Sequence, residues 1–487
     1  MITSAIAYVD RRVGWDLVLG LFAAVGLALA IALLPLTWTV LLILGGIVLV
    51  FTLVEPRLGL LFLIVAVPFG TVRQIRLGVM NVGLTEALLL LVAGAWLARL
   101  AIRRQDVQRR ATRPALLWPL AIFIGAMLLS LLVTWSLQYS VKELIKWSEV
   151  LLVYLLVALG VRGKWARALV LAVVITGALA ALHGIYQFLF RVGPEGFVLF
   201  GRFMRAYGTF EQPNPYGGYL GLTLPVALGL VVVAALGLGR WSRRGRWFTL
   251  TVAGISAVLM LAALIMSWSR GAWLGFGAAL VGMTIALVVK SGRGVVLSVI
   301  LVALVAYALL AGGLAQVPPS LIQRFSDFVP YLGVSDVRGA EITDANFAVL
   351  ERVAHWQAAW QMWTDHPWLG VGIGNYEPVY PRYALPQWPL ALGHAHNYYL
   401  NIAAETGIIG LAAYLVLWTV ALFQTWRVVR RASGWELGVA LGVLGVIIHL
   451  SVHNFVDNLY VHGMYLQLAV LLGLIAGIGN NQEVQPL

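Results

Sequence analysis

The class of fold is decided by residues 247–290, which read WFTLTVAGISAVLMLAALIMSWSRGAWLGFGAALVGMTIALVVK. They form two apolar runs, residues 247–267 and 271–290, with Arg270 as the charge between them. A helix that spans the hydrocarbon core of a bilayer needs roughly 20 mainly apolar residues, and each run is long enough. The stretch therefore predicts two antiparallel membrane helices joined by a very tight turn.

The remaining sequence has the same apolar character. Of its 487 residues, 61% are apolar and 11% are charged, and the mean hydropathy is +0.90, outside the usual balance of soluble domains. We expect an all-α polytopic integral membrane protein with 12–14 transmembrane helices. Arg11 and Arg12 precede an apolar run long enough to remain as an anchor, so no cleavable signal peptide is expected. The candidate segments are residues 14–35, 38–54, a short 58–70 that can be re-entrant, 83–102, 115–135, 143–161, 166–188, 216–236, 247–267, 271–290, 294–313, 397–424, 436–455 and 459–479.

Basic residues predict the orientation of these helices. They gather in alternate short loops, which the positive-inside rule places in the cytoplasm. With fourteen spans, both termini face the cytoplasm. The net charge of +13 then reflects topology and attraction to anionic lipid rather than nucleic-acid binding, because the basic residues are spread over separate loops. The chain has no cysteine, which excludes disulfides and thiolate chemistry. The basic loops hold Arg57, residues 103–113, 162–167, 240–246, 290–293 and 427–431.

One long segment, residues 314–396, interrupts the apolar chain on the predicted outer side. It is rich in proline and in acidic residues. Within it, Phe347 to Trp363 has apolar residues at helical spacing, with tryptophans at 356, 360 and 363. This pattern predicts an amphipathic helix that rests on the membrane surface or packs across the bundle. We therefore divide the chain into transmembrane helices 1–11 (residues 1–313), an outer lid segment (residues 314–396) and C-terminal transmembrane helices (residues 397–487).

Several polar residues fall on the same predicted outer side. A buried arginine at the membrane edge needs a partner or an anionic ligand, and a planar guanidinium suits phosphate oxygens. Each residue also has a structural explanation: the arginines can reach lipid head groups or solvent, the histidine at 396 can cap a helix, and His394 can be an ordinary loop residue. A pair four residues apart on one helical face can be joined by a structural hydrogen bond. The residues are Arg202, Arg205, Arg270, His396, and the pair His453 and Asp457.

The order of four short motifs resembles the O-antigen ligase and polymerase superfamily of membrane glycosyltransferases. The main motif is His396-Asn397, nine residues, Gly407, two residues and Gly410. The other motifs are an Arg-x-x-Gly-Thr-Phe-x-x-Pro-Asn element at residues 205–214, a Ser-Arg-Gly turn at 269–271, and an Asp-His-Pro-x-x-Gly-x-Gly-x-Gly-Asn run at 365–375. The resemblance covers residues 200–460.

The resemblance implies a metal-independent enzyme without a cofactor. It would transfer a glycan from an undecaprenyl diphosphate carrier to an acceptor hydroxyl, on lipid A-core or another glycan, at the outer face of the inner membrane. His396 would be the general base. Arg205 and Arg270 would bind the diphosphate, with Arg202, Asn397 and Asn214 as further substrate-binding candidates, and His453 and Asp457 would support the site.

General chemistry agrees with these assignments, and three alternatives stay open. A histidine accepts a hydroxyl proton efficiently near neutral pH, and fixed arginines stabilise a leaving diphosphate without magnesium. The partners are then a lipid-linked donor, a lipid or glycan acceptor and membrane lipids. The same residues fit a repeat-unit polymerase. An inorganic-carbon (bicarbonate) transporter or a lipid-linked glycan flippase needs polar residues near the bilayer midplane, whereas these residues gather at one face.

Overall fold

The structure, a computed structural model, describes residues 35–70, 75–77, 80–102, 114–296, 336–343 and 346–483, with residues 25–26 and 319. The helices are α2 (Leu36–Val54), α3 (Pro56–Phe69), α4 (Leu84–Ile102), α5 (Leu117–Ser130), α6 (Leu137–Gly160), α7 (Lys164–Phe190), α8 (Pro213–Ala235), α9 (Arg243–Met266), α10 (Arg270–Lys290), α14 (Phe347–Asp365), α15 (Tyr376–Val379), α16 (Tyr398–Arg431), α17 (Gly434–His453) and α18 (Met464–Glu483). Short 3-10 turns occupy Leu131–Val133, Glu195–Phe197 and Tyr380–Arg382. Two small antiparallel hairpins pair β1 (Ile75–Leu77) with β2 (Met80–Val82), and β3 (Val198–Leu199) with β4 (Phe203–Met204).

The prediction of an all-α polytopic membrane protein is confirmed. Within the described ranges, eight helices are long and apolar enough to cross a membrane, and three shorter apolar helices accompany them. Twelve of the fourteen predicted segments coincide with helices α2 to α10 and α16 to α18. The other two, residues 14–35 and 294–313, lie almost wholly outside the described residues. The short third segment is the 14-residue α3, which contains Pro68.

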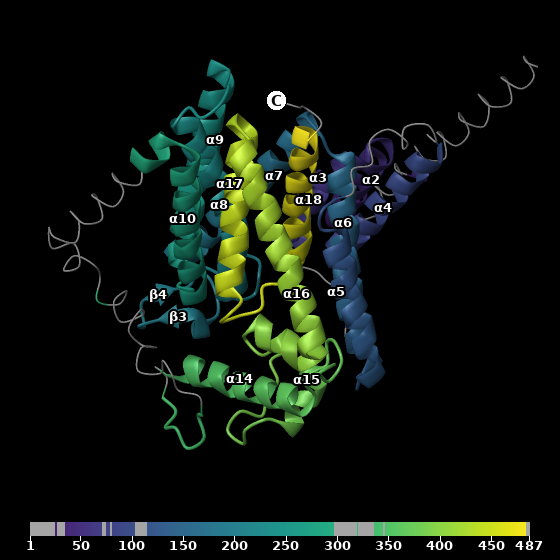
Figure 1. The fold of residues 1–487 in the computed structure, drawn as a ribbon, viewed down its shortest axis with the longest axis vertical. Helices are drawn as coiled ribbons and strands as arrows, with labels where there is room; N and C mark the ends of the chain where they lie inside the picture. Colours follow the sequence, from purple (N-terminus) through teal and green to yellow (C-terminus); the bar gives the residue numbers. More distant parts are fainter. Residues whose placement is uncertain are drawn as a thin grey trace, which may run out of the picture.

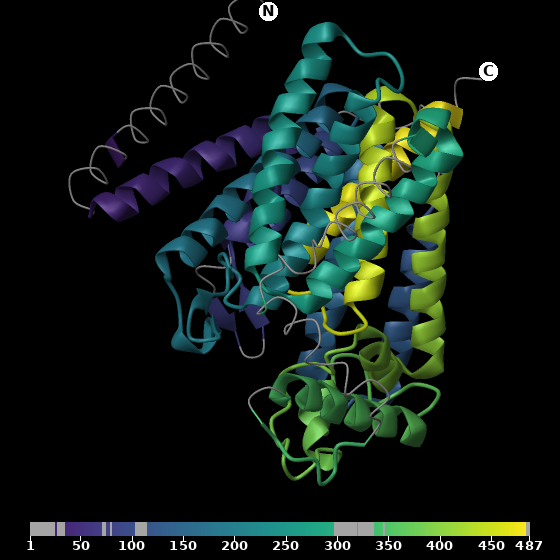
Figure 2. The same cartoon turned by 90° about the vertical axis from the view of Figure 1, so that its left-hand side faces the viewer.

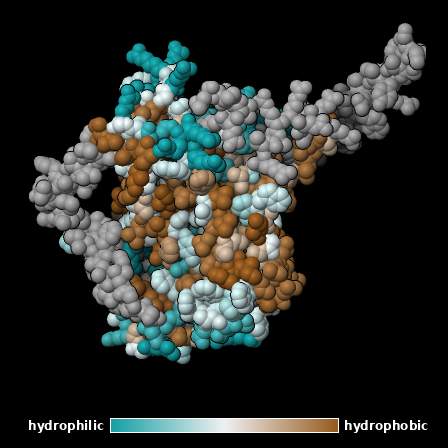
Figure 3. Space-filling view, in the orientation of Figure 1, coloured by the Kyte–Doolittle hydropathy of each residue, from teal (hydrophilic) through white to brown (hydrophobic). Residues whose placement is uncertain are grey.

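The apolar surface agrees with this assignment. Figure 3 shows hydrophobic side chains across the middle of the molecule and hydrophilic ones toward its two ends. The exposed side chains on the apolar helices include Leu129, Leu182, Ile255, Val281 and Phe423. Such a continuous apolar surface is unfavourable in water and is matched by lipid chains.

Helices α8 and α17 form the centre of the bundle. Helix α17 packs against α8 and α10, while α8 also contacts α9. Small residues let α8 and α17 approach closely: a Cβ added at Gly229 would lie 2.3 Å from the carbonyl oxygen of Gly438, and one at Gly442 would lie 2.4 Å from Cα of Val226. Close packing through small residues is the usual way in which membrane helices associate.

The two ends of the bundle differ. The basic end carries the loops near Arg162, Arg240 and Arg430. At the opposite end, which we name the α14 end, α14 crosses the bundle almost at right angles to it (Figure 1 and Figure 2). Helix α16 rises from this end and bends at Gly407, whose φ of 63° and ψ of −164° are not helical. The amide of Ile408 donates to the carbonyl of Pro367 there, so the outer segment is bound directly to the bend.

The predicted amphipathic helix is confirmed as α14, but its buried face differs from the predicted tryptophan face. The buried residues are Leu350, Val353, Ala354, His355, Ala358, Ala359 and Met362. Trp360 is exposed, and Trp356 is half-buried with its indole N–H donating to the carbonyl of His396. The small alanines allow close approach to α16, and the bulky indoles are left at the margin of the contact.

The glycine run of residues 370–374 fastens this outer segment to the α5–α6 connection. Gly372 has φ of +95°, and a Cβ there would lie 2.6 Å from Cα of Thr134. Asn375 follows and is fully buried. Its Oδ1 accepts from the amide of Ser136 at 2.7 Å, and its Nδ2 lies 2.8 Å from both Thr134 Oγ1 and Ser140 Oγ. Residues 370–375, which we name the glycine clip, therefore hold the outer segment against the bundle. They do not form a phosphate-binding loop.

Candidate functional site

His396 lies at the α14 end, immediately before α16. Its φ of 51° places it in the left-handed region, which is uncommon for a residue with a side chain. Asn397 caps α16 by accepting from the amide of Leu400 at 3.1 Å. The amide of Tyr398 donates to the carbonyl of Asn454 at 2.8 Å, which joins the start of α16 to the loop after α17. The chain is thus bound immediately after His396, whose imidazole is largely buried.

Asp457 faces two histidines of this turn. Its Oδ1 lies 3.9 Å from Nδ1 of His396 and 4.0 Å from Nε2 of His394. His394 is therefore part of the site and not an ordinary loop residue. The predicted placement of His453 and Asp457 on one helical face is wrong, because α17 ends at His453 and Asp457 lies in the loop beyond it. Once the helix ends, four-residue spacing no longer aligns two side chains.

The three donor groups of His394, His396 and Asp457 all lie within 4.8 Å of one another. Two imidazoles and one carboxylate are a ligand set that zinc accepts. The sequence predicts no metal here, and the geometry alone allows either a metal ion or a hydrogen-bonded cluster around a base.

Burial and neighbouring charges separate the roles of these groups. Burial and the nearby His396 lower the pKa of His394 to about 3, and the same two causes lower the pKa of His355 to about 4. Burial by itself would raise the pKa of Asp457, but the adjacent His396, with smaller effects of His394 and His453, holds it below its ordinary value. At neutral pH, Asp457 is therefore ionised while His394 and His355 are uncharged.

Helix α14 contributes residues that the sequence analysis missed. Arg352 donates through Nε to the carbonyl of Val456 at 3.1 Å and through Nη1 to the carbonyl of Ala348, so it contacts the loop that carries Asp457. The ring of His355 lies 5.5 Å from that of His396. Burial raises the pKa of Glu351, with His396 and Arg352 opposing the change. The sequence does contain a signal for these residues, because Glu351, Arg352 and His355 interrupt the apolar pattern of the helix.

Arg205 lies against the turn that precedes Arg270. Its Nε donates to the carbonyl of Ser267 at 3.0 Å, and its Nη2 donates to Asn214 Oδ1 at 3.1 Å. The amide of Ala206 donates to the carbonyl of Met266, which extends the contact. Arg205 and Ser267 are 62 residues apart in the sequence. Their hydrogen bond therefore brings the segment of Arg205 to the turn of Arg270, and Asn214 orients the Arg205 side chain.

Arg202 is placed differently. It is exposed in the turn between β3 and β4, and its guanidinium carbon lies 5.3 Å from the ring centre of Phe203. The carbonyl of Arg202 accepts a hydrogen bond from Arg191. This position at a hairpin turn separates it from the contacts that Arg205 makes.

The turn of Arg270 also adjoins the loop of Asp457. A Cβ added at Gly271 would lie 2.6 Å from the ring of His453 and 2.8 Å from Val456. His453 is buried, and its Nδ1 lies 3.4 Å from Nε2 of His449. Contacts therefore run continuously from Arg205 through the Arg270 turn and the 453–457 loop to His396. His453 lies inside the packing of α10 and α17 and supports this arrangement.

Comparison with known proteins finds a family model that matches part of the chain and part of this site. The model of the O-antigen ligase family matches residues 255–415. The match contains Arg270, α14, the glycine clip and the start of α16, whereas Arg205 and Asp457 lie outside it. The resemblance predicted from the motifs is thereby confirmed for this part of the chain. No curated protein matches the sequence.

Proposed function

We propose that the protein is a lipid-linked oligosaccharide glycosyltransferase of the O-antigen ligase type. It transfers a glycan from undecaprenyl diphosphate to a hydroxyl of lipid A-core or another glycan, at the periplasmic face of the inner membrane. The observation that carries this proposal is the contact chain at the α14 end, which joins two arginine-bearing elements to a histidine beside an ionised carboxylate. The family match supports the reaction class.

In the proposed reaction, His396 accepts the proton of the acceptor hydroxyl as its oxygen bonds to the anomeric carbon. The bond from that carbon to the diphosphate oxygen breaks, and undecaprenyl diphosphate leaves with the electron pair. A histidine positioned for this step contributes typically 10²–10⁴-fold to a rate. Asp457, 3.9 Å from Nδ1, is suited to orient the ring and to stabilise the imidazolium that forms.

Arg205 and Arg270 are proposed to bind the diphosphate. The leaving group gains negative charge as the bond breaks, and cations already held in place stabilise that charge without reorganisation. Arg205 is held in place by Ser267 and Asn214. Arg202 is the less favoured candidate because of its exposed position in the hairpin turn. Asn397 and Asn214 act as positioning residues. The side-chain oxygen of Asn397 caps α16, and that of Asn214 accepts a hydrogen bond from Arg205.

The proposed enzyme works without a metal ion. A metal ion bound by His396 would occupy the nitrogen lone pair that a general base needs, so the two roles exclude one another. A chelator therefore distinguishes the two roles. If His396 is a base, activity persists in EDTA, whereas a catalytic zinc site loses its ion and its activity.

The test is glycan transfer by the purified protein with a synthetic undecaprenyl diphosphate donor and a lipid acceptor. We expect His396→Ala to lower turnover by about two to four orders of magnitude with little change in donor affinity. His366→Ala is the matched control, because His366 is exposed on the same outer segment. Equal effects of the two substitutions, or activity abolished by EDTA and restored by zinc or magnesium, would contradict the proposal. The product's size separates transfer of a finished chain from polymerisation of repeat units.

A further inference from the structure

A polar cavity lies at the basic end of the bundle, opposite to the candidate active site. It has a volume of about 500 Å³ and is formed by the α6–α7, α8–α9 and α16–α17 connections together with the last part of α18. None of the residues that line this cavity belongs to the candidate diphosphate site.

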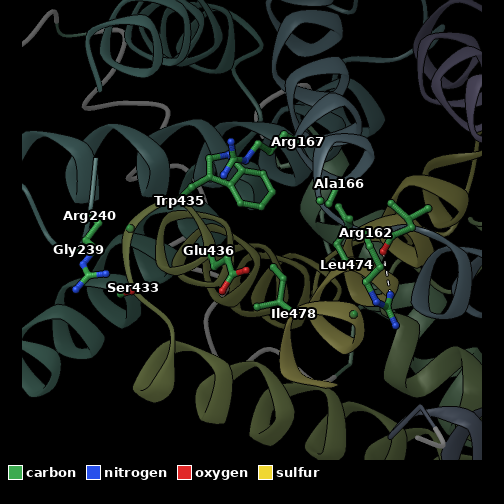
Figure 4. A pocket seen from close by; sticks show the side chains of 14 residues that line it. Arg162, Ala166, Arg167, Gly239, Arg240, Ser433, Trp435, Glu436, Leu474 and Ile478 are labelled. Carbon is green, nitrogen blue, oxygen red and sulfur yellow. Dashed lines mark hydrogen bonds between the residues drawn. The ribbon is translucent and has the colours of Figure 1, made fainter. Parts of the chain in front are cut away.

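Three arginines line the cavity. Figure 4 shows Arg162 and Arg240 toward opposite ends of the view and Arg167 beside the ring of Trp435, with Glu436 between them. The guanidinium carbon of Arg167 lies 5.9 Å from the centre of that ring. Among the lining residues Glu436 is the acid, so the cationic charges exceed the anionic ones. Such a set of guanidinium groups favours an anion with several oxygens.

Two helix starts add to this positive potential. Helix α7 begins at Lys164 after Gly163, helix α17 begins at Gly434 after Ser433, and neither has a side-chain cap. Gly163, Ser433 and Gly434 all line the cavity. The amides of Trp165 and Gly434 already donate to the carbonyls of Arg162 and Leu238. The other amides of each first turn and the positive end of the helix dipole together favour phosphate. Two unrelated structural features, arginine side chains and helix starts, thus point to the same ligand chemistry.

The remaining lining is apolar. Val161, Ala166, Leu474 and Ile478 contribute to the wall, and the cavity lies where the apolar helices end and the basic loops begin. In a membrane this level corresponds to the boundary between acyl chains and head groups. An amphiphile whose charged head meets arginines and whose first carbons meet aliphatic side chains fits this lining better than a fully hydrated ion.

We propose that this cavity binds the phosphate of an anionic phospholipid, such as phosphatidylglycerol or cardiolipin, from the cytoplasmic leaflet. The positive-inside rule places the basic end in the cytoplasm, and basic pockets between membrane helices suit such head groups. The same chemistry would accept phosphate from a soluble molecule, so the experiment separates the two sources.

The experiment is native mass spectrometry of the purified protein, in nanodiscs or detergent, titrated with phosphatidylglycerol, cardiolipin or phosphatidylcholine. The test variant is Arg167→Gln with Arg240→Gln, since both side chains are exposed, whereas Arg162 bonds the carbonyls of Ala158 and Val161. The matched control is Arg243→Gln with Arg244→Gln, which removes the same charge from exposed positions outside the cavity.

We expect anionic lipid to bind the wild-type protein and the control equally, and the test variant at least about tenfold more weakly, as loss of charge-assisted hydrogen bonds implies. Phosphatidylcholine should not distinguish the variants. An equal loss in test variant and control would mean diffuse attraction and overturn the site. Displacement of bound lipid by millimolar inorganic phosphate or glycerol phosphate would overturn the lipid as its ligand in favour of a soluble phosphate.

Discussion

At the scale of single residues, the arrangement around His396 combines backbone strain with charge. A non-glycine residue in the left-handed region costs of the order of 1–3 kcal/mol and persists where its surroundings hold it. At His396 three contacts hold the backbone: the capped start of α16, the Trp356 indole that donates to the His396 carbonyl, and the bond from the Tyr398 amide to the Asn454 carbonyl. Strain maintained in this way directs the imidazole toward Asp457.

The carboxylate of Asp457 should matter more than the neighbouring imidazole of His394. We expect Asp457→Asn to lower turnover roughly ten- to a hundredfold, because a charge-assisted interaction of about 1.5–3 kcal/mol with the forming imidazolium is lost. The matched change His394→Gln removes no charge above pH 5, since the pKa of His394 is about 3. Turnover measured from pH 5 to 8 should therefore keep its profile in His394→Gln.

The sign of the His394 shift also predicts a stability effect. A histidine whose folded pKa is lowered binds its proton more readily in the unfolded chain, so its contribution to stability is complete above about pH 6.5 and is lost as the pH falls toward 3. His394→Gln should flatten the acid limb of the unfolding curve. A changed turnover profile in His394→Gln, or an unchanged turnover in Asp457→Asn, would contradict this division of roles.

At the scale of elements, the glycine clip determines where the outer segment sits. Gly370 approaches the α16 backbone, Gly372 approaches Thr134, and Asn375 inserts into the α5–α6 connection. These contacts hold α14 and the turn of His396 against the bundle. The conformations at the three glycines, all with positive φ, are ones that side chains oppose.

Replacement of Asn375 should therefore loosen two elements that are distant in sequence. We expect Asn375→Ala to lower the free energy of unfolding by about 2–4 kcal/mol, because several buried partners lose their hydrogen bonds. Hydrogen exchange should increase both near residue 134 and in residues 367–376. Asn346→Ala is the control: Asn346 is also buried, but its bonds to Thr343 and Glu341 are local. Exchange that stays unchanged near residue 134 would show that the clip does not carry the contact.

At the scale of the whole molecule, the candidate active site and the lipid cavity occupy opposite ends of one membrane bundle. The absence of cysteine makes this arrangement directly measurable, because any introduced thiol is unique. Gln361 on α14 and Arg244 on α9 are both exposed and report on the two ends.

We expect Gln361→Cys to react with a membrane-impermeant maleimide in intact spheroplasts, and Arg244→Cys to react only after the membrane is opened. The reason is that the basic end should face the cytoplasm. Mass spectrometry of the labelled protein gives the result, with the cysteine-free parent as the control. The reverse pattern would invert the topology and remove the candidate active site from the periplasm.

Much of the architecture was determined by the sequence alone. Hydropathy acts locally, since about 20 apolar residues in a row are long enough to cross a bilayer wherever they occur. For this reason the apolar runs predicted α8, α9, α10 and α17 closely, and helical spacing predicted α14. The motifs around Arg205, Arg270 and His396 likewise predicted segments that the structure connects through neighbouring contacts at the α14 end.

Only the tertiary structure decided how those residues meet. The approach of Arg205 to Ser267 joins the loop after β4 to the turn between α9 and α10, and the approach of Asp457 to His394 and His396 depends on where α17 ends. The polar residues of α14 were visible in the sequence, but the contact of Arg352 with the 453–457 loop was not. The buried face of α14 shifted from tryptophan to alanine because close packing against α16 favours small side chains. The spacing of apolar residues indicates which face of a helix is buried. Which element covers that face is determined by contacts between distant parts of the chain.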